Sequence, residues 1–146
     1  MRLIAHRGNL YGPNPARENS PDYVDEASAA GCDVEVDVWY ECRGWSLGHD
    51  APQYPITFEW LWRRRDSLWL HCKNLEALSG LINTAGTGLF NAFWHESDAY
   101  TLTTKGYIWT SPTSSLGPRC VLVGLDVRGA STQISIHGLC TDYPLA

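Results

Sequence analysis

The sequence predicts an α/β protein with its helices mainly in the N-terminal half and with short strands and short loops in the C-terminal half. Apolar residues recur at helical spacing only up to about residue 88. Beyond that point, short apolar runs alternate with polar or Gly/Pro-containing segments too short for well-formed helices. The chain has 146 residues, which suits one compact unit, so we expect a single domain over residues 1–146.

Alternating strands and helices are expected in the first half. A strand over residues 2–6 ends at a glycine, and a helix follows that Ser20 caps, that begins with Pro21 and that ends at Gly31. The later elements are a strand over 45–48, a helix from Thr57 to Arg65, a buried strand over 68–73 and a helix from Asn74 to Gly86. Apolar runs at 89–94, 106–109, 120–123 and about 134–140 predict the strands of the second half.

Residues 33–39 alternate acidic and apolar side chains, which is typical of a strand. A period of two places Asp33, Glu35 and Asp37 on one face and the valines on the other. On a half-solvated strand the acids would simply face water. If helices cover the valine face, the acids face an enclosed interior, where they repel each other and require a cation.

Composition and charge exclude several classes of partner. The net charge is −5, so we expect no binding to nucleic acid or to anionic membranes, both of which require a basic surface. No apolar run approaches the ~20 residues that span a bilayer, and the N-terminus lacks a secretory apolar region. Five cysteines without a C-x-x-C pair indicate reduced, mostly buried thiols. We therefore expect a cytoplasmic protein.

Charged clusters end four successive predicted strands. They are His6-Arg7-Gly8, Glu35-x-Asp37, His49-Asp50 and His71-x-Lys73. Because the carboxyl ends of parallel strands converge on one rim, we expect these clusters to lie together. Carboxylates bind a hard divalent cation, cationic side chains neutralise an anionic substrate, and histidines transfer protons.

The same motifs, in this order, resemble a known family. H-R-G at 6–8, E-N at 18–19, G-x-x-x-E-x-D at 31–37 and H-D at 49–50 are similar to the signature of the glycerophosphodiester phosphodiesterases, within the phospholipase-C-like phosphodiesterases. The Lys73 strand, Trp109-Thr110 and Thr141-Asp142-x-Pro144 resemble later motifs. The resemblance implies a metal-dependent hydrolase of small phosphodiesters on a TIM barrel. Such barrels typically need about 250 residues, so this one would be abbreviated.

The resemblance also implies roles for individual residues. His6 and His49 would be the general acid and base, in an order that the sequence does not decide. Arg7 would bind a phosphate oxygen, and Lys73 would neutralise charge that develops on the phosphoryl group.

The metal and substrate residues follow from the same motifs. Glu35 and Asp37 would bind Mg²⁺ or Ca²⁺. Glu18 is expected to line the pocket, and Trp109 to form an apolar wall against the organic part of the substrate. Outside these motifs, His95 with Asp98 could reach the rim.

This chain departs from the family pattern in two ways. His71 stands where the family has a third metal-binding glutamate; it either binds the metal, which would favour Mn²⁺ or another transition metal, or only forms a hydrogen bond. The later helices are missing, which exposes strands that a homodimer would cover.

Two alternatives to the hydrolase remain open. One is a catalytically reduced barrel that binds a phosphorylated ligand, which the missing loops and His71 favour and the His6/His49 pair disfavours. The other is a related lyase or lipid phosphodiesterase that releases a cyclic phosphate. His137 has no partner motif and is interpreted as structural.

Overall fold

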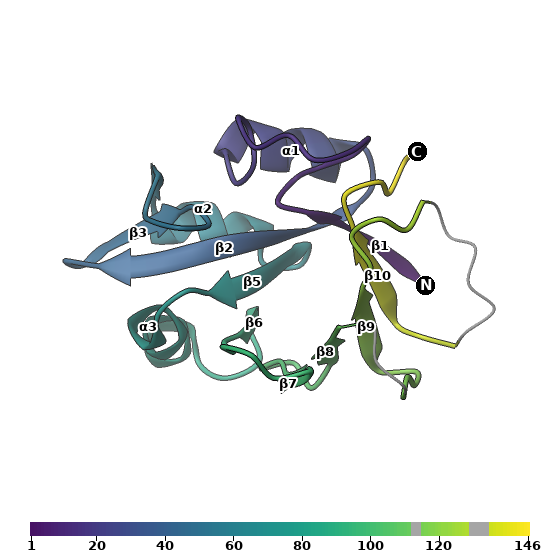
Figure 1. Cartoon of the computed structure of the whole chain (residues 1–146). Helices are drawn as coiled ribbons and strands as arrows, with labels where there is room; N and C mark the ends of the chain where they lie inside the picture. The colour runs from purple at the N-terminus through teal and green to yellow at the C-terminus, as the bar shows by residue number, and fades with distance from the viewer. Residues whose placement is uncertain (112–114, 129–134) are drawn as a thin grey trace.

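A curled, mainly parallel sheet with three helices on its outer face forms the molecule (Figure 1). The computed structural model describes residues 1–111, 115–128 and 135–146. Within these ranges, seven strands pair in parallel in the order β6-β5-β2-β1-β10-β9-β8. They are β1 (Arg2–His6), β2 (Asp33–Glu41), β5 (Leu68–Cys72), β6 (Asn91–Phe93), β8 (Ile108–Thr110), β9 (Cys120–Val123) and β10 (Gly138–Thr141).

The curl encloses a core inside the sheet. Six strands each contribute one buried side chain to this inner cluster: Ile4, Trp69, Phe93, Trp109, Val121 and Cys140. Thr104, which precedes β8, bonds to β6: its N–H donates to the Ala92 carbonyl (2.9 Å), and the Ala92 N–H donates to Thr104 Oγ1 (2.9 Å). In the described residues β6 and β8 are not paired with each other. The fold is therefore a mixed α/β structure with an incompletely closed sheet.

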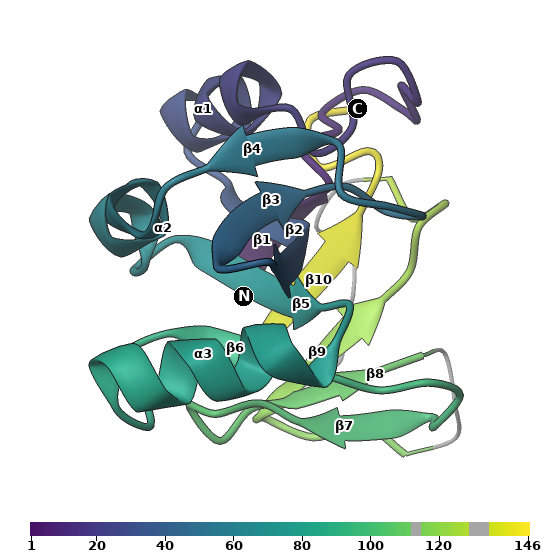
Figure 2. The ribbon, with the colours of Figure 1, turned by 90° about the vertical axis from the view of Figure 1, so that its left-hand side faces the viewer.

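Three helices cover the outer face of the β1-β2-β5 part of the sheet (Figure 2). They are α1 (Pro21–Ala29), α2 (Phe58–Arg64) and α3 (Leu75–Ala85). The valines of β2 are fully buried in an outer cluster that includes Val24, Leu61 and Leu81 from the helices. The acids of β2 therefore face the opposite, inner side of the sheet. In the parts of the chain that the structure describes, every helix ends before residue 86.

Side chains define the helix starts largely as expected. The side-chain oxygens of Thr57 and Asn74 accept from the N–H groups of Trp60 and Ala77 at the starts of α2 and α3. Ser20 occupies the N-cap position of α1, but its side chain forms no capping hydrogen bond there. Four of the cysteines are buried, Cys42 is exposed, and none of the five forms a disulfide. Among the described helices, none has the length and apolarity to cross a bilayer.

The expected strand over residues 45–48 is present as β3 (Gly44–Leu47), but it does not run parallel to its neighbours. It pairs antiparallel with β2, and β4 (Tyr54–Ile56) pairs antiparallel with β3. The turn at Cys42 and Arg43, both with positive φ (49° and 64°), reverses the chain directly after β2. So short a connection cannot form the crossover that a parallel strand requires.

In the second half, one strand was not predicted. β7 (Tyr100–Leu102) pairs antiparallel with β8 and carries no run of apolar residues. The other apolar runs correspond to β6, β8, β9 and β10. The predicted run at 134–140 begins at residue 134, which lies outside the described residues.

Candidate active site

The candidate site lies at the carboxyl ends of β1 and β5 and beside the middle of β2, the strand between them. The parallel register places His6 beside Glu35, and Asp37 beside His71. Since paired residues of neighbouring strands point to the same face, the four side chains meet on the inner side of the curl. The structure thus brings together residues from three strands that are far apart in the sequence.

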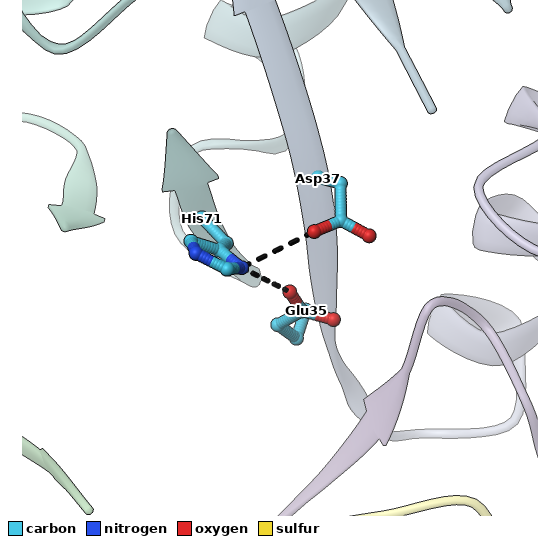
Figure 3. Close-up of side chains that lie close together, drawn as sticks. All are labelled: Glu35, Asp37 and His71. Atoms are coloured by element: carbon cyan, nitrogen blue, oxygen red, sulfur yellow. Dashed lines mark ion pairs between the residues drawn. The ribbon is translucent and has the colours of Figure 1, made fainter. Parts of the chain in front are cut away.

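Three of these side chains form a group suited to a metal ion (Figure 3). One donor atom from each of Glu35, Asp37 and His71 lies within 4.8 Å of the others. His71 Nδ1 is 3.2 Å from Asp37 Oδ1 and 3.8 Å from Glu35 Oε1. Asp37 Oδ1 is buried and forms no hydrogen bond with the described residues. Two carboxylate oxygens and one imidazole nitrogen fit a divalent cation, so the residues present match the expected metal.

The pKa values of the two carboxyl groups are shifted in opposite directions. Burial raises the pKa of Glu35, and the nearby charge of Asp37 raises it further. Burial acts in the same direction on Asp37, but the close approach of His71 Nδ1 to Oδ1 and the charge of Arg7 outweigh it and hold the pKa of Asp37 well below its usual range. Asp37 is therefore ionised, and Glu35 lacks an equally strong partner.

The positive charges of the site gather around Asp37. Arg7 Nε is 3.0 Å from Asp37 Oδ2, and Lys73 Nζ is 3.4 Å from Asp37 Oδ1. The Asn19 side chain donates to Oδ2 (3.0 Å) and accepts from the Asp37 N–H (2.9 Å). These contacts fix the carboxylate and place Arg7 and Lys73 beside the metal group.

His6 is oriented by Asp142, a residue at the other end of the chain. His6 Nδ1 donates to Asp142 Oδ1 (2.8 Å), and Nε2 lies 3.9 Å from Glu35 Oε2. Burial lowers the pKa of His6, but the hydrogen bond with Asp142 and the charge of Glu35 outweigh it, so the pKa is raised. Asp142 thus holds one ring nitrogen, and the other faces Glu35, one of the three potential metal ligands.

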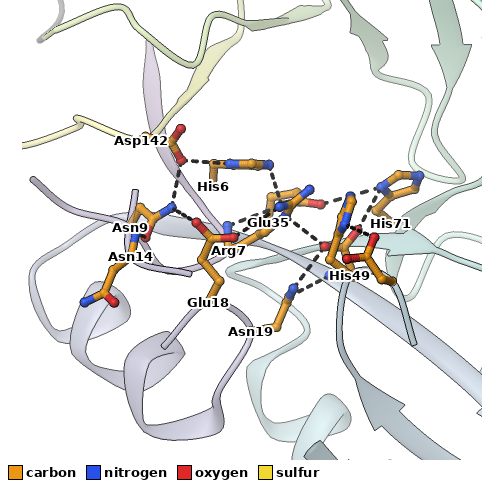
Figure 4. Close-up of polar contacts among 12 residues, drawn as sticks. His6, Arg7, Asn9, Asn14, Glu18, Asn19, Glu35, His49, His71 and Asp142 are labelled. Atoms are coloured by element: carbon orange, nitrogen blue, oxygen red, sulfur yellow. Dashed lines mark hydrogen bonds and ion pairs between the residues drawn. The ribbon is translucent and has the colours of Figure 1, made fainter. Parts of the chain in front are cut away.

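A buried asparagine links Glu18 and Asp142, the two carboxylates that contact Arg7 and His6 (Figure 4). Asn9, with no exposed surface, donates from Nδ2 to Glu18 Oε1 (2.9 Å) and to Asp142 Oδ1 (2.8 Å). Glu18 Oε2 in turn accepts from Arg7 Nη1 (3.1 Å). Glu18, which was expected to line the pocket, thus both lines a cavity with Arg7 and orients its guanidinium.

Two residues of this network have a strained backbone conformation. Arg7 and Asn19 are non-glycine residues with positive φ (53° and 63°), a conformation that costs energy and occurs often at functional sites. Gly8 also has positive φ (90°), and a Cβ atom there would lie 3.0 Å from the ring of Tyr23. The H-R-G motif therefore forms a turn after β1 that directs Arg7 toward Asp37 on β2.

His49 reaches the site by a route that differs from the expected one. β2 continues past the site to Glu41, and β3 returns antiparallel, so the end of β3 comes back to the same rim. The Gly48 N–H donates to the Asp37 carbonyl (3.1 Å), which anchors the next residue there. His49 Nδ1 donates to Asp50 Oδ1 (2.8 Å), and the ring is partly exposed.

Two cavities meet at Arg7. One of about 460 Å³ is lined by His49, Glu18 and Asn19, and one of about 150 Å³ by His6, Glu35, His71 and Trp109. Arg7 lines both. Trp109 is almost fully buried and stacks on Phe93 with ring centroids 4.7 Å apart, so it forms an apolar wall next to His6 and His71.

Four further residues complete the site. Asp142 lies in the Thr141-Asp142-x-Pro144 motif and Asn19 in the E-N motif, so the sequence marked both positions without indicating their contacts. Asn9 had no signal in the sequence. His95 lines the smaller cavity with Asp98, and its ring centroid is 5.0 Å from that of His71. Burial and the neighbouring His71 lower the pKa of His95.

Comparison with known proteins identifies no family. No protein-family model, no curated protein and no solved structure matches the chain significantly. The chemistry of the site therefore has to be argued from its own residues.

Proposed function

We propose that the chain is a metal-dependent phosphodiesterase, on an abbreviated TIM-barrel-like fold, that hydrolyses small phosphodiesters of the glycerophosphodiester class. One arrangement carries the proposal: His6, oriented by Asp142, faces three potential metal ligands. Arg7 and Lys73 place positive charge at the same point. Proton carrier, metal ligands and anion-binding cations are the groups that phosphodiester cleavage requires.

Glu35, Asp37 and His71 would hold the cation. A divalent ion bound there supplies a Lewis acid for a phosphoryl oxygen. Mg²⁺, Ca²⁺ and Mn²⁺ are the candidate ions, and the nitrogen donor of His71 favours Mn²⁺.

The substrate phosphate would be oriented by Arg7. Its Nε and Nη1 contact Asp37 and Glu18, which leaves Nη2 to donate to a phosphate oxygen. Lys73, at 3.4 Å from Asp37, would neutralise charge that develops on the phosphoryl group. Trp109 would contact the organic part of the substrate in the smaller cavity.

Two histidines in adjoining cavities suit proton transfer in opposite directions. The raised pKa of His6 favours its protonated form, so we assign to it the donation of a proton to the leaving alcohol. His49, on the other side of Arg7, would accept the proton of the attacking hydroxyl, which belongs either to water or to the substrate.

The proposal is tested by the hydrolysis of a glycerophosphodiester and of bis(p-nitrophenyl) phosphate, with Mn²⁺, Mg²⁺ or Ca²⁺ and with chelator. We expect chelator to abolish activity, and His6→Ala and His49→Ala each to lower it about 10²- to 10⁴-fold. Arg63→Ala, which removes an exposed arginine of α2 paired with Glu59, is the matched control.

The outcome separates the alternatives. If the metal-loaded wild type is no faster than His6→Ala, the chain is no hydrolase, and binding of a phosphorylated ligand becomes the better interpretation. A cyclic phosphate that persists in the ³¹P NMR spectrum would instead indicate a lyase. The expected homodimer stays a prediction, which sedimentation velocity tests.

A further inference from the structure

A further polar cavity lies at the opposite, amino-terminal end of the parallel strands. Arg2, Asp33 and Asn91, the first residues of β1, β2 and β6, line it, together with Tyr107 and His137, which directly precede β8 and β10. The cavity holds about 90 Å³. The inner apolar cluster lies between this end and the candidate active site. The proposed hydrolysis uses none of these five residues.

Several side chains of the cavity wall pack against one another or already have hydrogen-bond partners. The Tyr107 and His137 rings have centroids 4.1 Å apart, and Trp69 lies 5.3 Å from Tyr107. Asp33 accepts two hydrogen bonds from Arg2 Nη1, both at 2.9 Å, and one from Trp69 Nε1 at 3.0 Å. The Asp33 carboxylate is therefore neutralised and does not require a ligand.

Two other groups in the wall lack partners among the described residues. Asn91 is only 5% exposed, and its Oδ1 is buried without a hydrogen bond. Burial of such a group without a hydrogen bond is energetically unfavourable, so Asn91 Oδ1 is suited to accept a hydrogen bond from a ligand. Lys105 also lines the cavity, and its ammonium group forms no ion pair or hydrogen bond within the described part of the chain.

The remaining charges do not cancel that of Lys105. Arg2 is paired with Asp33, and Arg65 has Asp66 as its neighbour, with Nη2 3.7 Å from Oδ2. Lys105 is therefore the charged side chain of the wall that no opposite charge among the described residues of the wall neutralises. Burial and the charge of Arg2 lower the pKa of His137, so its imidazole is neutral at neutral pH and can donate one hydrogen bond.

We propose that this cavity binds a small oxoanion that carries a proton of its own, of which hydrogenphosphate is the simplest example. Its P–OH group would donate to Asn91 Oδ1, and its charged oxygens would accept from Lys105 Nζ and from the His137 ring. The volume of about 90 Å³ has room for a phosphate-sized group and excludes larger ligands from the enclosed part. Free hydrogenphosphate and the end of a phosphate monoester share this chemistry.

Isothermal titration calorimetry in chelator, with inorganic phosphate near pH 6.5, tests the proposal. We expect Lys105→Gln and Asn91→Leu each to weaken binding at least about tenfold. Arg7→Gln, which removes the anion-binding side chain of the other site, and Arg63→Gln, which removes an exposed cation, should leave binding unchanged. Sulfate has the same shape but no proton at this pH, so it should bind at least about tenfold more weakly.

Two results would overturn the proposal. Loss of phosphate binding in Arg7→Gln but not in Lys105→Gln would mean that the anion binds at the candidate active site. Equal affinity for sulfate would mean that Asn91 Oδ1 accepts no hydrogen bond from the ligand. Phenyl phosphate distinguishes the two sources when it is compared with inorganic phosphate at about pH 5.5, below the second pKa of about 6 of a phosphate monoester, so that both ligands keep a P–OH group. Binding as tight as that of inorganic phosphate supports a monoester, and weaker binding supports the free ion.

A second measurement does not depend on the stability of the variants. In the wild-type protein, phosphate should shift the NMR signals of the Asn91 side-chain amide and the Trp69 indole N–H. Signals of Glu18 and Asn19, in the other site, should stay unchanged. The reverse pattern would contradict the proposal. Because the cavity is separate from the metal group, either result is independent of whether the chain is a phosphodiesterase.

Discussion

Asp37 is the residue around which the candidate site is built. It contacts Arg7, Asn19, His71 and Lys73, although only the two basic residues and His71 were predicted to lie near it. The two oxygens have different neighbours: Oδ2 is bound by Arg7 and Asn19, and Oδ1 faces His71 and Lys73. A cation therefore has access to one carboxylate oxygen that the surrounding residues leave without a hydrogen bond.

The identity of the metal depends on His71. We expect His71→Glu to raise the affinity for Mg²⁺ and Ca²⁺ at least about tenfold and to reduce the preference for Mn²⁺, since a carboxylate adds a hard, charged oxygen donor. Competition titrations with the three ions measure this. His71→Ala is the companion variant: if it leaves all three affinities unchanged, His71 does not bind the metal.

Asp142 acts on His6, and its removal should change two observables together. In Asp142→Asn the carboxylate that helps to raise the pKa of His6 is lost, so this pKa should fall. Activity should drop about 10- to 100-fold, because the ring loses its orienting partner. Histidine NMR titration and steady-state kinetics measure the two effects. Asp126→Asn, at an exposed position, should change neither; an unchanged His6 pKa in Asp142→Asn would contradict the assignment.

At the scale of elements, the hairpin of β2 and β3 decides where His49 lies. Because His49 follows a short predicted strand, we expected it at the end of another parallel strand. The chain instead reverses after β2, and the antiparallel return brings His49 back to the rim. His49 therefore lies where it was expected, but through a different topology. β2 extends beyond the site, and β3, which runs back antiparallel to it, ends at the same edge of the sheet as a parallel strand would.

Gly48 lies in the turn directly before His49 and determines the position of this histidine. The φ of Gly48 is +151°, and an added Cβ would collide with the Ala51 carbonyl oxygen. We expect Gly48→Ala to cost about 1–3 kcal/mol of folding free energy and to lower activity, since the turn must shift. Thermal unfolding and kinetics measure these changes. Gly117→Ala, with no atom within 4 Å of the added Cβ, is the control. Equal stability of the two variants would show that the turn tolerates a side chain.

At the scale of the whole molecule, the curl buries like charges that a bound cation should stabilise. Glu35 and Asp37 are almost fully buried on the inner face. At a hundredfold excess over the dissociation constant, a metal ion should stabilise the fold by about 2.7 kcal/mol, or roughly 5–10 °C in Tm. Calorimetry with and without chelator measures the shift. Glu35→Gln should abolish it, and a full shift in that variant would exclude Glu35 as a ligand.

The metal-free protein should also respond to pH. The pKa of Glu35 is raised in the folded state, so folding binds a proton between this value and the unfolded value. His6 acts in the same direction. The lowered pKa values of His95 and His137 act in the opposite direction as the pH falls, and they do so equally in the wild type and in Glu35→Gln. Without metal, we therefore expect the wild type to gain stability relative to Glu35→Gln as the pH falls through the folded pKa of Glu35. Urea unfolding in chelator at several pH values measures it; the same slope in both proteins would contradict the shift in Glu35.

Features that depend on residues a few positions apart could be predicted from the sequence. Thr57 and Asn74 start their helices, and the period of two on β2 sets Glu35 and Asp37 on one face, because caps and side-chain alternation are local properties. Four features depend on how the whole chain folds: the direction of β3, the pairing of His6 with Asp142 across 136 positions, the bridge through Asn9 and the cavity at the amino-terminal end. These contacts exist because the curled sheet places β10 beside β1, and no short-range spacing encodes which strands become neighbours.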